Sequence, residues 1–138
     1  MAETDGREPV LLVVEDEAPN RALLRAVLSR ASDDRIRGAS IVEATTLAEA
    51  RAHLEAGPVD VILLDVRLPD GSGLDLAREL QARAGGRPAV LILSASVLPM
   101  ERFAAEEAGA DAFLAKPYEP RQLLDVLTGL VAGGLRGG

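Results

Sequence analysis

The chain has 138 residues, of which 48% are hydrophobic, and this is enough to build the core of one folded domain. Its formal net charge of −7 repels phosphate backbones, and no cluster of Lys and Arg offsets it, so we expect no direct nucleic-acid binding. Cysteine is absent, which excludes disulfides and thiolate metal sites. Residues 1–8 lack the apolar stretch of a signal peptide, and the apolar runs are too short to cross a membrane, so we expect a cytoplasmic protein.

Five apolar runs alternate with segments of helical periodicity along the chain. The expected strands cover 10–14, 40–44, 59–65, 89–94 and 112–115, and the expected helices cover about 18–32, 46–57, 72–85, 99–108 and 119–131. Strands that are continuously apolar, rather than alternating, are buried on both faces, as in a parallel sheet. The pattern therefore predicts an α/β fold, a (βα)5 doubly wound parallel five-stranded sheet with helices on both sides.

The sequence also predicts where this single domain begins and ends. We expect an N-terminal tail over 1–8, one domain over 9–131 and a flexible Gly-rich tail over 132–138. The segment 31–40 is longer than a usual connection and is expected to be an extra helical turn or a longer loop, with no assigned role. One side of the first helix is expected to hold Leu23, Ala26, Val27 and Arg30, with Leu24 and Leu28 close by.

Polar residues stand where the expected strands end. Four strands are followed or closed by a charged or hydroxyl residue, namely Glu15-Asp16-Glu17, Asp65, Ser94 and Lys116. In a doubly wound sheet the functional site lies beyond these carboxyl ends. Clustered carboxylates repel one another, so such a cluster usually holds a cation.

These residue types suit phosphoryl transfer to a carboxylate. Asp16 and Asp65 can supply the oxygen ligands that Mg²⁺ prefers, and an Asp carboxylate is an adequate nucleophile. The Ser94 hydroxyl can donate to one phosphoryl oxygen and Lys116 can neutralise another.

Other chemistries lack the residues they need. His53 is the only histidine and lies within an expected helix, so a zinc site and a Ser-His-Asp triad are excluded. The segment Gly71-Ser72-Gly73 is expected to be a turn and helix cap, because it lacks the spacing of a phosphate-binding loop. Glu101, Glu106 and Glu107 are expected to form a solvated helix face.

The motifs VVEDE, LLDVRLPDGSG, LILSAS and FLAKPY together resemble the receiver domain of two-component response regulators. The resemblance covers roughly Val10 to Leu130, with the motifs in the family's order. It implies a flavodoxin-like fold with strand order 2-1-3-4-5.

The resemblance also implies a phosphoacceptor and a metal site. Asp65 matches the phosphoacceptor. The implied ligands of Mg²⁺ are Asp16, Asp65 and the backbone carbonyl of Arg67, with Glu15 binding directly or only through water. The positions of Arg67 and Ser96 are those that tune dephosphorylation in the family.

The remaining implied roles concern switching. Ser94 and Lys116 match the residues that stabilise the phosphoryl group, and Ser94 and Phe113 match the switch pair. The Lys116-Pro117 peptide bond is expected to be cis. On phosphorylation, Ser94 is expected to move toward the phosphoryl group and Phe113 to fill the space that it leaves.

The implied partners are a histidine kinase or a histidine phosphotransfer protein, and a downstream partner or output domain at the face of the fourth helix, fifth strand and fifth helix. A monomer or a weak phosphorylation-dependent dimer is expected. Both a stand-alone receiver and the N-terminal piece of a longer regulator remain open, whereas the start at Met1 argues against a receiver cut from a hybrid kinase.

Two other functions share part of this residue pattern. A phosphatase of the haloacid-dehalogenase type also uses an Asp nucleophile with Mg²⁺, but it needs a second acid at the position of Arg67, and the chain has no room for a cap domain. A phosphate-independent interaction module of receiver shape is disfavoured because no element of the phosphorylation site is missing. We therefore expect a signalling domain and not a metabolic enzyme.

Overall fold

A five-stranded parallel sheet forms the centre of the computed structural model, which describes the backbone of residues 8–83, 87–95 and 99–137 and the side chains of these as far as residue 132. The strands of this sheet are β2 (Val10–Val14), β3 (Ser40–Ala44), β4 (Val61–Asp65), β7 (Ala89–Ser94) and β8 (Ala112–Ala115). Their order is β3-β2-β4-β7-β8, with every neighbouring pair parallel. This confirms the predicted fold class and strand order.

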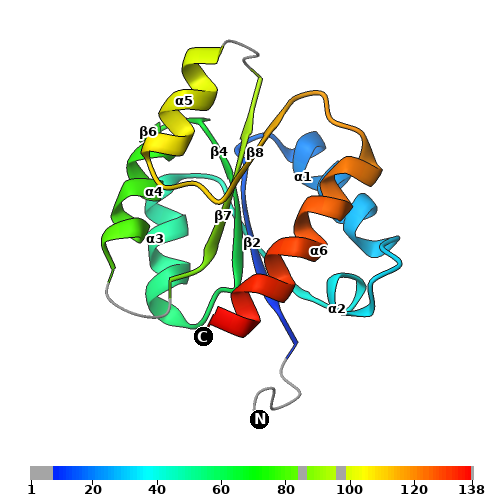
Figure 1. Cartoon of the computed structure of the whole chain (residues 1–138). Helices are drawn as coiled ribbons and strands as arrows, with labels where there is room; N and C mark the ends of the chain where they lie inside the picture. Colours follow the sequence, from blue (N-terminus) through cyan, green and yellow to red (C-terminus); the bar gives the residue numbers. More distant parts are fainter. Residues whose placement is uncertain (1–7, 84–86, 96–98, 138) are drawn as a thin grey trace.

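Helices cover both faces of the sheet (Figure 1). They are α1 (Ala18–Ser29), α2 (Asp34–Arg37), α3 (Leu47–Ala56), α4 (Gly73–Ala82), α5 (Pro99–Glu107) and α6 (Pro120–Gly137). Figure 1 shows α1, α2 and α6 on one face and α3, α4 and α5 on the other. Within the described residues, no helix is both long and apolar enough to cross a membrane.

Each central strand contributes to two hydrophobic cores because successive side chains point to opposite faces. Leu12 and Val14 pack in the core under α3, α4 and α5, whereas Leu11 and Val13 pack in the core under α1, α2 and α6. This double burial explains why the strands are continuously apolar.

On the face covered by α1, α2 and α6, two helices differ from expectation. In α1 the buried residues are Leu24, Val27 and Leu28, whereas Leu23 is 54% exposed. The segment 31–40 contains the short helix α2, which is the expected extra helical turn, and Asp33 caps its first turn by accepting a 2.8 Å hydrogen bond from the backbone N–H of Arg35. Helix α6 continues to Gly137, so it extends past the expected helix end at about residue 131.

A small antiparallel hairpin follows β4 and was not expected. It consists of β5 (Arg67–Leu68) and β6 (Gly71–Ser72). Gly71 has a φ of +146°, a conformation that favours glycine. The Asp70 carboxylate in the turn accepts hydrogen bonds from the backbone N–H groups of Leu47 (2.8 Å) and Ala48 (3.1 Å), so the hairpin caps α3.

The hairpin returns the chain to the end of β4. The backbone N–H of Gly73 donates to the Val66 carbonyl at 2.7 Å, and a Cβ at Gly73 would lie 2.1 Å from the Asp65 carbonyl oxygen. Glycine is therefore required for this close approach. The expected helix end at Gly85-Gly86 and the residue Ser96 lie outside the described residues.

Candidate functional site

Three carboxylates gather at the carboxyl edge of the sheet. Glu15 and Asp16 directly follow β2, and Asp65 is the last residue of β4, which pairs with β2. One carboxylate oxygen from each residue lies within 4.8 Å of the others. Asp16 is exposed, whereas Glu15 is 2% exposed. Carboxylate oxygens at this spacing suit a hard divalent cation, so the cluster could hold a metal ion.

The ammonium of Lys116 binds two of these carboxylates. Its Nζ lies 3.0 Å from Glu15 Oε1 and 3.2 Å from Asp65 Oδ2. The Lys116 backbone N–H donates to the Ser94 carbonyl at 2.7 Å, which ties the segment after β8 to the end of β7. Lys116 thus offsets part of the repulsion between the two acids. The Lys116-Pro117 peptide bond is cis, in agreement with the expectation.

The two acids beside Lys116 differ in their pKa. Burial raises the pKa of the Asp65 carboxyl, and the charge of Glu15 adds to this, although Lys116 opposes it. Burial alone would also raise the pKa of Glu15, but hydrogen bonds from Lys116 and the Glu17 backbone N–H outweigh it, so its pKa is lowered. The negative charge of Asp65 is therefore stabilised less well by its surroundings than the negative charge of Glu15.

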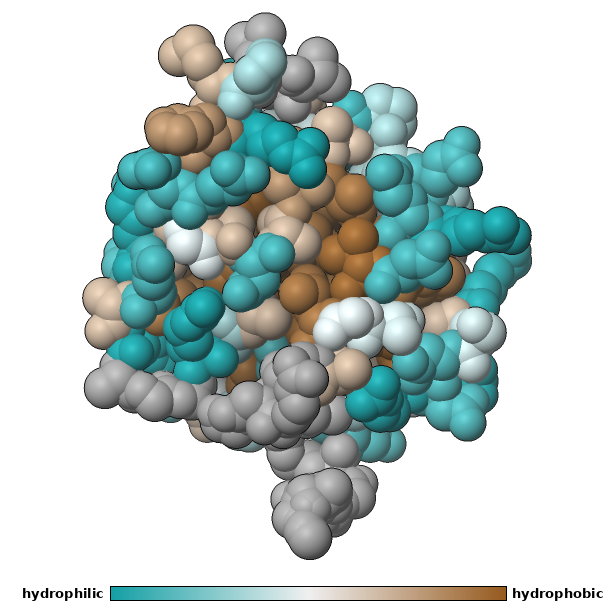
Figure 2. Space-filling model, in the orientation of Figure 1, coloured by the Kyte–Doolittle hydropathy of each residue, from teal (hydrophilic) through white to brown (hydrophobic). Residues whose placement is uncertain are grey.

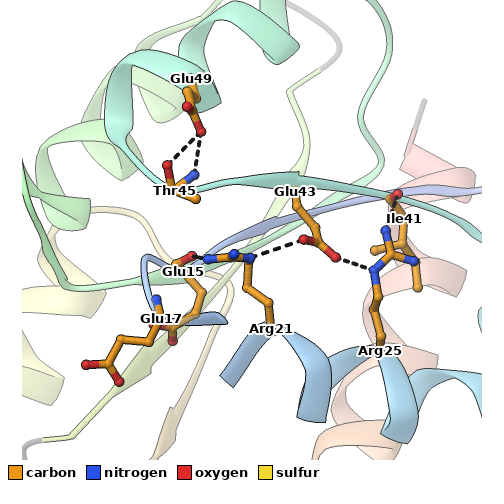
Figure 3. Close-up of polar contacts among 8 residues, drawn as sticks. All are labelled: Glu15, Glu17, Arg21, Arg25, Ile41, Glu43, Thr45 and Glu49. Atoms are coloured by element: carbon orange, nitrogen blue, oxygen red, sulfur yellow. Dashed lines mark hydrogen bonds and ion pairs between the residues drawn. The ribbon is translucent and has the colours of Figure 1, made fainter. Parts of the chain in front are cut away.

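An arginine pair fixes the backbone beneath the cluster (Figure 3). Arg21 on α1 donates from its NH1 group to the Glu15 carbonyl at 2.9 Å and from Nε to Glu43 Oε1 at 3.1 Å. Arg25, one turn later, donates to the other Glu43 oxygen and to the Ile41 carbonyl. The network ties α1 and β3 to the residue that opens the acidic cluster. It was not foreseen, because Arg21 and Arg25 stand in the polar part of a helical pattern.

Ser94 is buried at the end of β7, with 2% exposure, and its hydroxyl donates to Glu101 Oε1 at 2.9 Å. Glu101 Oε2 lies 3.9 Å from the guanidinium of Arg67, the second residue after Asp65. The expectation that Glu101 belongs to a solvated helix face is therefore wrong, although Glu106 and Glu107 are exposed. The sequence carried no signal for this contact, because Glu101 stands at a polar position of the helical pattern, as Glu106 and Glu107 do.

The structure also shows where three other residues named in the sequence analysis lie. Phe113 on β8 is partly exposed, and the guanidinium carbon of Arg102 on α5 lies 5.6 Å from its ring centre, a cation–π contact. Glu17 is the N-cap of α1 and does not belong to the acidic cluster. His53 lies on the expected helix, α3, and is half-buried.

A largely apolar groove of about 360 Å³ opens beside the acidic cluster. Its lining consists of Glu15, Asn20, Leu23, Leu24, Leu93, Ala95, Lys116, Pro117 and Tyr118. Burial raises the pKa of the Tyr118 hydroxyl. The exposed Leu23 side chain and the site lysine thus share one concave surface.

The chain is similar in sequence to regulatory proteins of bacteria. The family described as the response regulator receiver domain matches residues 11–128. The chain is 33% identical over 123 residues to the transcriptional regulatory protein AruR and 39% identical over 125 residues to the response regulator protein PilR, both of Pseudomonas aeruginosa. These matches cover 89% and 91% of this chain but 49% and 26% of the relatives, so the chain spans about half or less of their length.

Solved structures agree with this match. The receiver domain of the sensor histidine kinase PA1611 from Pseudomonas aeruginosa, which has a magnesium ion in its active-site cleft, is 28% identical, with a TM-score of 0.77 over 91% of this chain and 99% of that one. The receiver domain of a histidine kinase from Syntrophus aciditrophicus is 26% identical, with a TM-score of 0.79 over 91% of each chain. From the family match, the relatives and the shared architecture, we conclude that the chain belongs to the response regulator receiver domain family of two-component systems.

Proposed function

We propose that this receiver domain, over residues 9–131, accepts a phosphoryl group on Asp65 from a phosphohistidine of a histidine kinase or histidine phosphotransfer protein, in the cytoplasm. The observation that carries the proposal is the position of Asp65 at the end of a buried strand, with Lys116 Nζ 3.2 Å from its Oδ2. The strand holds the Asp65 carboxylate in place, and the adjacent ammonium of Lys116 can stabilise the negative charge of an incoming phosphoryl group.

The transfer is an in-line displacement. An Asp65 carboxylate oxygen attacks the phosphorus, the P–N bond of the donor breaks as the P–O bond of an acyl phosphate forms, and the departing imidazole nitrogen takes up a proton from solvent. In the product, Lys116 neutralises one phosphoryl oxygen and the Ser94 hydroxyl donates to another.

The donor set fits Mg²⁺. We propose that Asp16, Asp65 and the Arg67 backbone carbonyl bind it directly. Both oxygens of Glu15 already accept hydrogen bonds, Oε1 from Lys116 and Oε2 from the Glu17 backbone N–H at 3.1 Å, which favours binding through water for Glu15. When bound, the ion supplies charge neutralisation between Asp65 and the incoming phosphoryl group.

The apolar groove beside the site suits docking of the donor protein. It reaches from the exposed Leu23 on α1 to Tyr118 and includes Glu15 and Lys116 in its lining. A donor that covers Leu23 would bury apolar surface while its phosphohistidine lies next to Asp65.

The downstream surface is proposed at the face of α5, β8 and α6. Figure 2 shows an apolar area in the middle of this face, between the α5 side and the α6 side, where β8 forms the edge of the sheet. Met100 and Phe103 on α5 are 79% and 62% exposed. Phe113 belongs to β8 and contacts Arg102 of α5, so movement of the switch pair would alter this face. A partner protein, an output domain or a second copy in a weak phosphorylation-dependent dimer would bind here.

A phosphatase mechanism is disfavoured. It needs an acid two residues after the nucleophile, where this chain has Arg67, whose side chain is 83% exposed and points its guanidinium at Glu101. A guanidinium stays protonated and cannot act as a general acid or base at neutral pH.

The test is phosphate incorporation from acetyl phosphate in the presence of Mg²⁺, followed by intact-mass measurement. We expect the wild type to gain one acid-stable, base-labile phosphoryl group and Asp65→Asn to gain none. Asp75→Asn is the matched control, because Asp75 is an exposed carboxylate on α4, and it should label as the wild type does. Equal labelling of Asp65→Asn would exclude Asp65 as the acceptor, and steady turnover of a phosphate ester would favour the phosphatase instead.

A further inference from the structure

The Ser94 hydroxyl donates its hydrogen bond to a carboxylate on α5. It donates to Glu101 Oε1 at 2.9 Å, and Ser94 is buried, so water competes poorly for this bond. A serine hydroxyl carries one proton and can donate only one hydrogen bond at a time. The same proton therefore cannot serve Glu101 and a phosphoryl oxygen on Asp65 together.

Glu101 has a second partner, Arg67, which can still pair with its carboxylate when the hydrogen bond from Ser94 is broken. Its Oε2 lies 3.9 Å from the Arg67 guanidinium, which comes from the hairpin strand that follows Asp65. Glu101 itself is partly buried in the first turn of α5, with 24% of its side chain exposed. A carboxylate in this position competes for the Ser94 proton and also repels a phosphoryl dianion.

We propose that Glu101 is a positioning residue that holds the Ser94 hydroxyl in the unphosphorylated state and thereby weakens the response of the domain to a phosphoryl group. The proposal rests on the proposed function of Asp65. When Asp65 is phosphorylated, the Ser94 hydroxyl breaks its hydrogen bond to Glu101 and donates to a phosphoryl oxygen instead, and the Glu101 carboxylate stays paired with Arg67. Because Glu101 belongs to α5, this exchange links the occupancy of Asp65 to the helix of the proposed downstream surface.

The test uses beryllofluoride, a phosphoryl mimic, titrated into the full chain with Mg²⁺ and followed by isothermal titration calorimetry. Replacing a charged acceptor by a neutral one weakens a hydrogen bond by about 1 kcal/mol, so Glu101→Gln should bind the mimic about three- to tenfold more tightly than the wild type. Glu101→Ala removes the acceptor and should bind at least as tightly. Glu107→Gln is the matched control, with the same loss of charge at an exposed position of α5, and should bind as the wild type does.

A double-mutant cycle tests whether Glu101 acts through Ser94. Ser94→Ala should bind the mimic more weakly than the wild type, and Glu101→Gln should give no gain in the Ser94→Ala background. No gain in the single Glu101 variants, or an equal gain with and without the Ser94 hydroxyl, would overturn the proposal. Failure of the wild type itself to bind the mimic would instead refute the proposed function of Asp65.

Discussion

Lys116 Nζ lies 3.2 Å from Asp65 Oδ2, which joins the end of β8 to the end of β4 across the intervening strand β7. The same nitrogen is 3.0 Å from Glu15 Oε1. Burial alone would lower the pKa of Lys116, but its hydrogen bonds and the two acidic charges outweigh this and raise it, so the ammonium stays charged at neutral pH. One cation therefore contacts both acids of the free site, and in the proposed function it also binds a phosphoryl oxygen.

Removing this cation should cost stability as well as function. In Lys116→Ala, the buried Glu15 and Asp65 lose their shared partner, and we expect a loss of about 2 kcal/mol in the free energy of unfolding in EDTA. Added Mg²⁺ should restore part of the loss, because in the proposed site it binds Asp65 and Asp16 directly, and only in the folded state. Urea unfolding of both proteins, with and without Mg²⁺, measures this. An unchanged stability in EDTA would show that the Lys116 contacts contribute nothing net.

Neutralising Asp65 should have the opposite effect on the metal-free protein. Burial raises the pKa of Asp65 above its ordinary value of 3.8, so the folded state binds more protons than the unfolded state. The contribution of Asp65 to stability therefore falls as pH rises from below 3.8 through the raised folded pKa. We expect Asp65→Asn to be more stable than the wild type by about 1 kcal/mol at pH 7 in EDTA, with the difference shrinking toward pH 4. A difference that does not change with pH would contradict this explanation.

The ion pairs of Glu43 with Arg21 and Arg25 should stabilise the protein more at high pH than at low pH, which is the reverse of the trend for Asp65. Hydrogen bonds from Arg25 and Arg21 hold the pKa of Glu43 below its ordinary value of 4.5. Its stabilising contribution is thus present above that value and is lost as pH falls through the lowered folded pKa. Since Glu43 is partly exposed, we expect Glu43→Gln to cost only about 0.5–1 kcal/mol at pH 7 and nothing at pH 3. Urea unfolding at the two pH values measures this, and an equal cost at both would exclude the ion pairs as its source.

Much of the fold could be predicted because the strands have a strong pattern. The predicted bounds of the strands at 89–94 and 112–115 equal those observed. Each of these strands is an apolar run with polar or charged residues, or proline, close to both of its ends. The hairpin of β5 and β6 could not be foreseen, because strands of two residues carry no periodicity. Helix α6 runs past the predicted end at about residue 131, because the helix continues through Gly133 and Gly134, which the sequence pattern treats as residues that end a helix.

The site was predictable to a similar degree. Asp65, Ser94 and Lys116 each stand at the end of a strand, and parallel strands bring these ends to one edge of the sheet. Glu101 was missed because helical periodicity separates polar from apolar positions and does not show which polar residue meets a buried strand end. That contact depends on where α5 lies above β7, which only the tertiary structure gives.

The close approach of Gly73 to the Asp65 backbone leads to a last prediction. A Cβ at position 73 would lie 2.1 Å from the Asp65 carbonyl oxygen and 3.0 Å from Leu64 Cγ, so Gly73→Ala must displace the end of β4. We expect a loss of about 2–4 kcal/mol in the free energy of unfolding, together with weaker Mg²⁺ binding.

Gly129→Ala is the matched control for this substitution. A Cβ there would meet no atom within 4 Å, and the residue lies in α6, where alanine is a better helix former. We expect it to raise stability by about 0.5–1 kcal/mol and to leave Mg²⁺ binding unchanged. Urea unfolding and Mg²⁺ titration of both variants measure the contrast. If Gly73→Ala kept the stability and Mg²⁺ affinity of the wild type, the position of Asp65 would not depend on the contact with residue 73.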